Sequence, residues 1–228
     1  MADNIRDRLL RVQERIHTAT TRVGREPSSV TLVAVSKTIP VEGIQEALAA
    51  GVTILGENKV QEARDKIDAL PGQATWHLVG HLQTNKAKLA VQLFDLIHSL
   101  DSEKLAQMLD RCGERAGKTV PCLIEVNLGG EESKSGMSEE GVRPLLEAAG
   151  RCSHLRIEGL MAIPPFLLDS ESVRPYFRRL RTLRDKLAAE GHPLPELSMG
   201  MTSDFEAAIE EGATLVRVGT AIFGPRRM

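Results

Sequence analysis

The chain has 228 residues, of which 42% are hydrophobic and 26% are charged, and its formal net charge is −2. This composition is typical of a soluble globular protein, and the near-neutral charge gives no basic field that would attract nucleic acid. Residues 1–25 carry charges throughout and contain no apolar run of signal-peptide length, which predicts neither a secretion signal nor a membrane span. We therefore expect a cytoplasmic location.

The three cysteines, Cys112, Cys122 and Cys152, show no Cys-x-x-Cys spacing. An odd number of cysteines without paired spacing argues against a disulfide framework, and free cysteines are usually buried. We expect reduced, buried thiols that take no part in chemistry.

An amphipathic helix opens the chain and is followed by a strand and a second helix. Apolar residues at steps of three and four mark the first helix: Ile5, Leu9, Val12 and Ile16. Residues 29–37, "SVTLVAVSK", are rich in β-branched side chains and predict a buried strand. Pro40 then suits a first helical turn and Gly51 supplies a stop, so a helix is predicted between them.

The strand and helix unit repeats along the rest of the chain. Strands are predicted at residues 53–57, 75–83, 96–101, 120–128, 155–163, 196–201 and 214–224. Helices are predicted between them at residues 58–70, 84–94, 102–117, 138–152, 172–191 and 203–212. At the start of the first of these helices, Asn58 and Gln61 stand where a capping pair would.

This alternation indicates parallel β-α-β crossovers, and eight such units close naturally into a (β/α)8 TIM barrel. We expect one such domain over residues 1–228, with an extra N-terminal helix. A doubly wound open sheet is the structural alternative.

Lys37 ends the first predicted strand, two positions after Val35 and four after Val33, so that all three side chains would point the same way. In a barrel, the C-terminal strand ends carry the functional site. A lysine confined there has a lowered pKa, and its neutral amine can form an imine with a carbonyl compound. The alternative is a side chain that extends to water, so a second signal is needed.

The second signal comes from the loops after the last two predicted strands. "SMGMTSD" (198–204) places small residues and a hydroxyl before a helix, and "VGTAIFG" (218–224) places Gly219 and Thr220 at the end of the last strand. TIM barrels often bind phosphate with these two loops. Alternatively, Ser203 and Glu206 only form a capping box and the glycines only make turns.

An imine-forming lysine and a phosphate site together predict a pyridoxal 5'-phosphate (PLP) site. Arg217 could face the pyridine nitrogen from the last strand and keep it unprotonated, which weakens the ring as an electron sink. Alternatively, Arg217 pairs with Glu125 or Glu158.

Six ordered segments resemble one known family over nearly the whole chain. They are "VAVSKT", "GENKVQEA", "WHLVGHLQTNK", "IEVNLGGEESKSG", "GLMAI" and "LSMGMTSDFEAAIEEGATLVRVGTAIFG". They resemble the pyridoxal phosphate homeostasis proteins (the YggS/PROSC family), which are similar to the N-terminal barrel of alanine racemase.

The resemblance implies a role for each candidate residue. Lys37 would be the Schiff-base lysine, and Arg217 would lie by the ring nitrogen. The phosphate would be held by residues of the two late loops: Met199, Gly200, Thr202, Gly219 and Thr220. Asn58 and His81 would line the pocket.

The sequence favours a cofactor carrier over an enzyme. Racemisation needs two bases, and alanine racemase takes its second from a tyrosine of a separate domain. Here the only tyrosine is Tyr176, whose neighbours suggest that it packs in a helix. We expect a monomeric PLP-binding protein, without catalytic residues of its own, that carries, buffers and regulates the free cofactor and so indirectly affects amino-acid and keto-acid pools. PLP-dependent apoenzymes are the expected partners. A PLP-dependent racemase of low activity and a cofactor-free barrel with a Schiff-base lysine are the alternatives.

Three other features are given less weight. His77 and His81 fall on one strand face, but no third metal ligand is in sight. Residues 178–186 are basic but are offset by neighbouring acids, which favours a solvated face over a nucleic-acid patch. Lys134, in the loop after the fifth strand, could contact a ligand or a partner.

Overall fold

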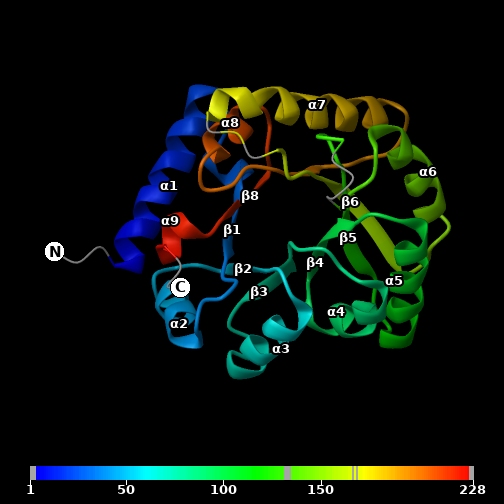
Figure 1. The fold of residues 1–228 in the computed structure, drawn as a ribbon, viewed down its shortest axis with the longest axis horizontal. Coiled ribbons are helices and arrows are strands. Elements are labelled where there is room, and N and C mark those ends of the chain that lie inside the picture. The colour runs from blue at the N-terminus through cyan, green and yellow to red at the C-terminus, as the bar shows by residue number, and fades with distance from the viewer. Residues whose placement is uncertain (1–3, 131–134, 166, 168, 226–228) are drawn as a thin grey trace.

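Eight parallel strands close into a barrel in the computed structural model, which describes residues 4–130, 135–165, 167 and 169–225 (Figure 1). The strands are β1 (Thr31–Val35), β2 (Ile54–Glu57), β3 (Thr75–Leu78), β4 (Leu96–Leu100), β5 (Val120–Glu125), β6 (Leu155–Met161), β7 (Glu196–Ser198) and β8 (Leu215–Val218). Each strand pairs with the next, and β8 pairs with β1, where Thr31 stands opposite Leu215. The predicted (β/α)8 barrel is confirmed, because the β8–β1 pairing leaves no open edge.

Helices surround the barrel, one after each strand and one before the first (Figure 1). They are α1 (Ile5–Arg22), α2 (Val41–Ala49), α3 (Val60–Ala69), α4 (Ala87–Leu93), α5 (Glu103–Ala116), α6 (Glu139–Ala149), α7 (Ser170–Ala189), α8 (Phe205–Glu210) and α9 (Thr220–Phe223). Short 3-10 turns precede β1 and α4 at Pro27–Ser29 and Thr84–Lys86. The extra N-terminal helix is therefore present, and α1 packs against α8 and α9.

Buried apolar residues form two layers. The larger layer lies between the sheet and the helices and includes the predicted stripe of α1, in which Leu9 and Val12 are each 1% exposed. A smaller cluster consists of Val33, Val79, Leu96, Leu123, Met161 and Leu215. Side chains alternate along a strand, so these residues fill the barrel interior below its C-terminal mouth.

Several predicted element boundaries were wrong. The last strand ends at Val218, and Thr220–Phe223 forms α9, because Gly219 leaves the extended conformation and its carbonyl accepts hydrogen bonds from the amides of Ile222 and Phe223. The third strand ends at Leu78, five residues early. A Cβ on Gly80 would lie 2.4 Å from the Asn58 carbonyl oxygen, so the chain there is a loop packed on its neighbour.

The expected Asn58–Gln61 capping pair does not form. Lys59 stands at the N-cap of α3, and no side chain caps that helix. Asn58 instead lies in the loop between β2 and α3, where it faces the mouth of the barrel.

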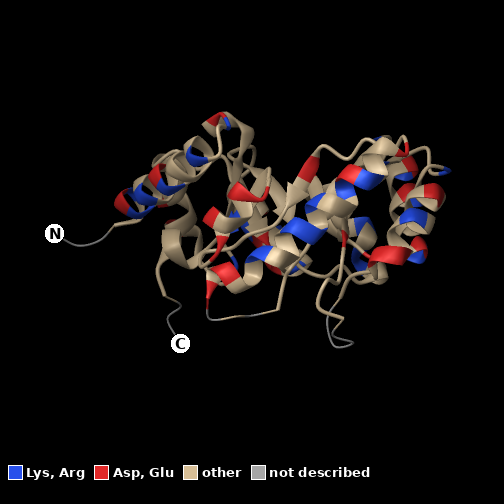
Figure 2. Ribbon diagram, turned by 90° about the horizontal axis from the view of Figure 1, so that it is seen from above, with Lys and Arg blue, Asp and Glu red and all other residues tan. Residues whose placement is uncertain are grey.

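The surface carries mixed charges, and Figure 2 shows basic and acidic residues interspersed on the outer helices. No helix in the described ranges is long and apolar enough to cross a membrane. All three cysteines are free, as predicted, and Cys112 and Cys122 are buried, but Cys152 is only partly buried, so the predicted burial of all three is wrong for Cys152. Burial raises the pKa of the Cys122 thiol, which therefore stays protonated and unreactive.

Candidate functional site

A cavity of about 400 Å³ opens at the C-terminal mouth of the barrel. Polar residues from both ends of the chain line it: Lys37, Asn58, Thr202, Ser203, Arg217 and Thr220. Apolar side chains such as Val79, Ile163 and Phe223 form the rest of its wall. The barrel closure brings these residues together, since β8 lies beside β1.

Lys37 follows β1 by two residues and lines this cavity. The residue after it, Thr38, has a φ of 65°, the only positive φ of a non-glycine residue in the described chain. Such a conformation is unfavourable for a β-branched residue, so it must be imposed by contacts on either side of Lys37.

Those contacts come from a buried cluster on β2 and α3. The ammonium of Lys66 donates to the Ser36 carbonyl oxygen at 2.7 Å and to Oε1 of both Glu57 and Glu62, each at 2.7 Å. The Ser36 hydroxyl donates to Glu57 Oε1 at 2.6 Å, and the Thr38 amide donates to Glu62 Oε1 at 2.5 Å. The residues before and after Lys37 are therefore both fixed by one ion cluster.

The opposite side of the cavity consists of the loops after β7 and β8. The backbone amides of Thr202, Ser203 and Thr220 donate to no other group among the described residues. The same three residues, each of which carries a hydroxyl group, line the cavity, and the Ser203 hydroxyl also contacts Asp204 Oδ2 at 3.4 Å. Amides at the start of a helix lack an intrahelical partner, so this side offers several donors to an anion.

Gly200 shapes the first of these loops. Its φ is +91°, and a Cβ there would lie 2.6 Å from the Cβ of Ala208 and 2.9 Å from the Cα of Phe205. Only glycine allows the loop to turn this tightly against α8. The turn is completed by Asp204, whose Oδ1 accepts a hydrogen bond from the Met201 amide at 2.6 Å.

Arg217 projects from β8 into the cavity and is 4% exposed. Its guanidinium donates to Ser198 Oγ at 2.6 Å and to the Ala162 carbonyl oxygen at 2.9 Å. Burial lowers the pKa of Arg217 to about 10, against the opposing charges of Glu125 and Asp204. The side chain is therefore a fixed cation at neutral pH.

A buried chain of imidazoles supports Arg217 from below. His98 Nδ1 lies 2.9 Å from Ser198 Oγ, and His98 Nε2 lies 3.1 Å from His77 Nδ1. Burial lowers the pKa of His77 to about 4 and that of His98 well below its ordinary value, so both rings are neutral at pH 7. The chain fixes the orientation of the guanidinium without adding charge.

The structure brings together six of the nine predicted site residues. Those that line the cavity are Lys37, Asn58, Thr202, Arg217, Gly219 and Thr220. Met199 is fully buried in the core, and Gly200 packs against α8, so both shape the loop from behind. His81 lies outside this cavity and lines a smaller one beside it, with its Nδ1 3.3 Å from Asp101 Oδ2.

Two of the alternative interpretations are wrong. Glu206 does not cap α8 with Ser203 but forms an ion pair with Arg15 of α1, whose Nε lies 2.6 Å from Glu206 Oε1. Arg217 makes no direct ion pair with a carboxylate in the described chain, and Glu158 pairs with Arg156.

The structure also shows where the residues of the other sequence-based hypotheses lie. No group of three or more metal-ligating side chains occurs within the described ranges, and His77 contacts His98 rather than His81. Tyr176 packs partly buried against the core, as predicted. Lys134 lies outside the described residues.

Sequence reasoning missed the supporting residues. His98 was not singled out, although it lies two residues after Leu96, which faces the barrel interior, and Ser198 was considered only as part of the segment 198–204. Glu125 was considered only as a partner of Arg217. The period-two alternation in β5, in which Leu123 and Glu125 face the same way, is a signal that could have placed it in the barrel.

The residues present fit a phosphorylated aldehyde such as PLP. An amine, a fixed guanidinium and a set of amides and hydroxyl-bearing residues line one cavity, the amine on one side and the amides on the other. Gly219 lets β8 lie close to β1, since a Cβ there would be 3.1 Å from the Val35 carbonyl oxygen.

Comparison with known proteins places the chain among PLP-associated proteins. The family model "Alanine racemase, N-terminal domain" matches residues 8–227. The pyridoxal phosphate homeostasis protein of Aquifex aeolicus is 47% identical over 98% of this chain and 99% of its own length. The protein of the same name from Escherichia coli K12 is 40% identical over 98% of this chain and 97% of its own.

Solved structures agree. PipY of Synechococcus elongatus, in a structure with PLP bound, has a TM-score of 0.82 at 41% identity and covers 93% of this chain and 100% of its own. An alanine racemase from Clostridium difficile has a TM-score of 0.76 at 15% identity, and only 58% of that chain is covered, so the likeness concerns the fold alone. The near full-length relatives and the family match together show that the chain belongs to the pyridoxal phosphate homeostasis protein family, within the alanine racemase N-terminal domain family.

Proposed function

We propose that this chain binds PLP in the 400 Å³ cavity and acts in cofactor homeostasis as a carrier and buffer of PLP. The observation that carries the proposal is the meeting of Lys37, Arg217 and the donor-rich loops in one cavity. A relative with 41% identity is described with PLP bound, and curated relatives share the homeostasis name. We further propose that the whole site resides in one barrel domain.

Each group has a distinct task in this proposal. When bound, PLP supplies an aldehyde that condenses reversibly with a primary amine, and Lys37 supplies that amine. The amides and hydroxyls of Thr202, Ser203 and Thr220 bind the phosphate. Arg217 places its charge beside the pyridine nitrogen, where it opposes protonation of that nitrogen. Asn58 lines the side of the pocket next to Lys37.

The lining of the cavity favours holding the cofactor over turnover. No His, Tyr, Cys, Asp or Glu lines this cavity among the described residues, so the cavity itself offers no second base beside Lys37. The cavity is also open to water, which weakens electrostatic stabilisation of a transition state. Its curated relatives are named as homeostasis proteins rather than as enzymes.

PLP titration of the purified chain tests the proposal. The mixture should acquire a visible absorption band, and borohydride reduction should leave a pyridoxyl group on the peptide that contains Lys37. Lys37→Ala should abolish both signals. Lys59→Ala, which removes an exposed lysine from the N-cap of α3, should change neither. A chain that stays colourless and takes up no PLP would refute the proposal.

An assay with amino acids separates the carrier from the racemase alternative. The PLP-loaded chain is incubated with single L-amino acids in deuterium oxide. A racemase would exchange the α-hydrogen for deuterium and form the enantiomer, whereas we expect neither from a carrier. Turnover that disappears with Lys37→Ala would contradict the carrier role.

We propose PLP-dependent apoenzymes as recipients, with the chain acting as a cytoplasmic monomer. The PLP-loaded chain is mixed with such an apoenzyme, and the recovery of the apoenzyme's activity is followed over time. Recovery should be faster than with the same amount of free PLP, at a concentration below the apoenzyme's dissociation constant for PLP. Sedimentation analysis measures whether the chain is monomeric. Equal rates in the two mixtures would argue against direct delivery.

A further inference from the structure

A second cavity, of about 240 Å³, adjoins the one that contains Lys37. The two cavities share Asn58, Val79 and Ile163 in their walls. The second one extends toward the ends of β3 and β5, where His81 and Glu125 line it. A molecule bound there would lie directly beside the proposed cofactor.

Glu125 is the unusual residue of this cavity. It ends β5 and is 6% exposed, yet its carboxyl group has no hydrogen bond or ion pair with any described residue, and Oε2 is completely buried. Other buried acids have partners: Glu57 accepts from Lys66 and Ser36, and Glu211 accepts from arginines of α7.

An unpartnered buried carboxyl group is costly, and native proteins retain such groups where a ligand or a function requires them. A hydrogen bond or ion pair within the protein would remove this free-energy cost. No residue in the described part of the chain supplies that partner, and a bound ligand would supply it.

The surroundings of Glu125 select the charge of that partner. Burial raises the pKa of Glu125 to about 7, helped by the negative charge of Asp101 and opposed by Arg217. His81 also faces the cavity, beside Asp101. No lysine or arginine lines this cavity in the part of the chain that the structure describes. The cavity thus presents acceptors and an acid, which suits a cationic hydrogen-bond donor.

We propose that this cavity, which adjoins the one lined by Lys37, is a subsite for the ammonium group of a small amino compound, held by Glu125. An ammonium has three donors, and Glu125 and Asn58, whose side chains both carry acceptor oxygens, line this cavity. The volume suits a compound of a few heavy atoms. The inference rests on the proposed function only for the identity of the molecule in the neighbouring cavity. If that molecule is PLP, an amine in the second cavity would be placed to compete with Lys37 for its aldehyde.

Binding of ethylammonium to the chain without PLP tests the subsite, with ethanol as an uncharged probe of the same size. Without an aldehyde present, no imine can form, so the measurement reports the subsite alone. Ligand-observed NMR at pH 8 should show binding of ethylammonium and none of ethanol. Glu125→Gln should weaken ethylammonium binding at least tenfold, since it removes the charge and keeps the shape.

Glu158→Gln is the matched control, because Glu158 lies on the neighbouring strand β6 and its partner is the exposed Arg156. It should leave ethylammonium binding unchanged. The affinity of the unaltered chain should rise about tenfold per pH unit up to about pH 7, where Glu125 ionises, and then level off. In Glu125→Gln this pH dependence should disappear.

Three results would overturn the subsite: equal binding of the two probes, equal binding by Glu125→Gln, or an affinity independent of pH. PLP uptake by the same variants separates this inference from the proposed function. Glu125→Gln should still take up PLP and be reduced onto Lys37. A chain that binds ethylammonium but no PLP would contradict the proposed function and leave the subsite standing.

Discussion

Lys37 owes its position to a second lysine. Lys66 is 7% exposed and contacts Ser36, Glu57 and Glu62, so the ion cluster fixes the chain on both sides of Lys37. Burial raises the pKa of Glu57 despite hydrogen bonds from Lys66 and Ser36. The arrangement depends on Lys66 remaining charged, because without it Glu57 would be a buried carboxylate without a counter-ion.

Lys66→Met should lower the free energy of unfolding by about 3–5 kcal/mol, the usual cost of removing one partner from a buried ion pair. Urea unfolding measures this loss. The double variant Lys66→Met/Glu57→Gln should recover much of it, since the unpaired carboxylate is then gone. Lys59→Met, an exposed lysine of the same region, should cost less than about 0.5 kcal/mol. Equal losses for the two lysines would contradict the role of the cluster.

At this scale the sequence predicted the residues that touch the cavity better than those that support them. Lys37 and Arg217 were found because a strand pattern places them at the mouth of a barrel. Lys66 sits on a helix face between Glu62 and acidic neighbours, where a lysine usually pairs on the surface. Only the packing of α3 on β2 turns that pair inward, and this packing cannot be deduced from helical spacing.

At the scale of elements, the loop between β7 and α8 depends on Gly200. Gly200→Ala places a methyl group 2.6 Å from the Cβ of Ala208, and it also forces alanine into a left-handed conformation. Gly24→Ala is the matched control, because Gly24 has a φ of +68° and no atom within 4 Å of the added Cβ.

Gly200→Ala should therefore lower stability by about 1–3 kcal/mol more than Gly24→Ala does, as estimated for overpacking. It should also weaken PLP binding, because α8 must move away from Thr202 and Ser203. Thermal unfolding and PLP titration of the two variants measure these effects. If both variants lose the same stability, the close packing of Gly200 on α8 is not what the loop requires.

Element order was predictable from alternation, whereas element ends were not. Residues 214–224 looked like one apolar strand, but the last part forms α9 because the barrel is already closed and Gly219 ends the ladder. Likewise, "GHLQ" continues the apolar pattern of β3 but lies in a loop, since Gly80 packs on the backbone of Asn58. Such ends are set by neighbouring strands that are distant in the sequence.

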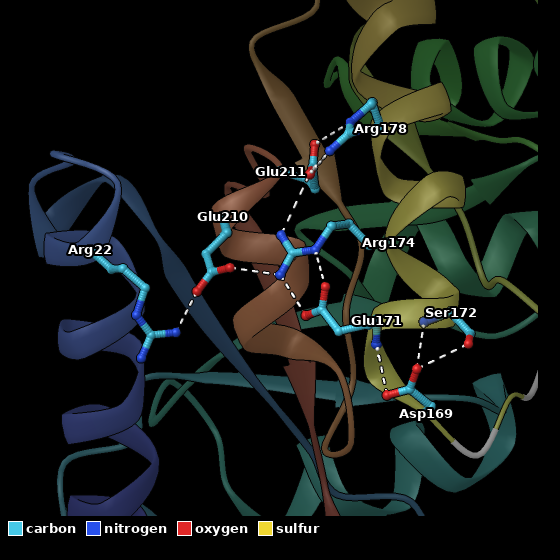
Figure 3. Close-up of polar contacts among 8 residues, drawn as sticks. All are labelled: Arg22, Asp169, Glu171, Ser172, Arg174, Arg178, Glu210 and Glu211. Atoms are coloured by element: carbon cyan, nitrogen blue, oxygen red, sulfur yellow. Dashed lines mark hydrogen bonds and ion pairs between the residues drawn. The ribbon is translucent and has the colours of Figure 1, made fainter.

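At the scale of the whole molecule, a network of arginines and glutamates joins three helices that are far apart in the chain (Figure 3). Arg22 of α1 pairs with Glu210 of α8, and Arg174 of α7 contacts Glu210 at 2.7 Å. Glu211, directly after α8, accepts from Arg178 at 2.8 Å. The network ties α8, whose N-terminal loop lines the cavity that contains Lys37, to its neighbours on both sides.

Glu211 should matter most in this network. Its side chain is 6% exposed and faces Arg174, Arg178 and Arg181, all from α7, which were predicted in part as a solvated basic face. Glu211→Gln would leave these three cations close together with no carboxylate among them. We expect a loss of about 2 kcal/mol in the free energy of unfolding, less than for a fully buried pair because Arg178 is mostly exposed.

Glu171→Gln is the matched comparison, because Glu171 also contacts Arg174 but its side chain is 63% exposed. Exposed ion pairs contribute little, so this change should cost clearly less stability than Glu211→Gln. Urea unfolding at low salt and at 1 M salt separates the two, because screening reduces the effect of a surface pair more than that of a buried one. If Glu171→Gln proves as costly as Glu211→Gln, burial does not set the contribution of these ion pairs, and Glu211 is not the central residue of the network.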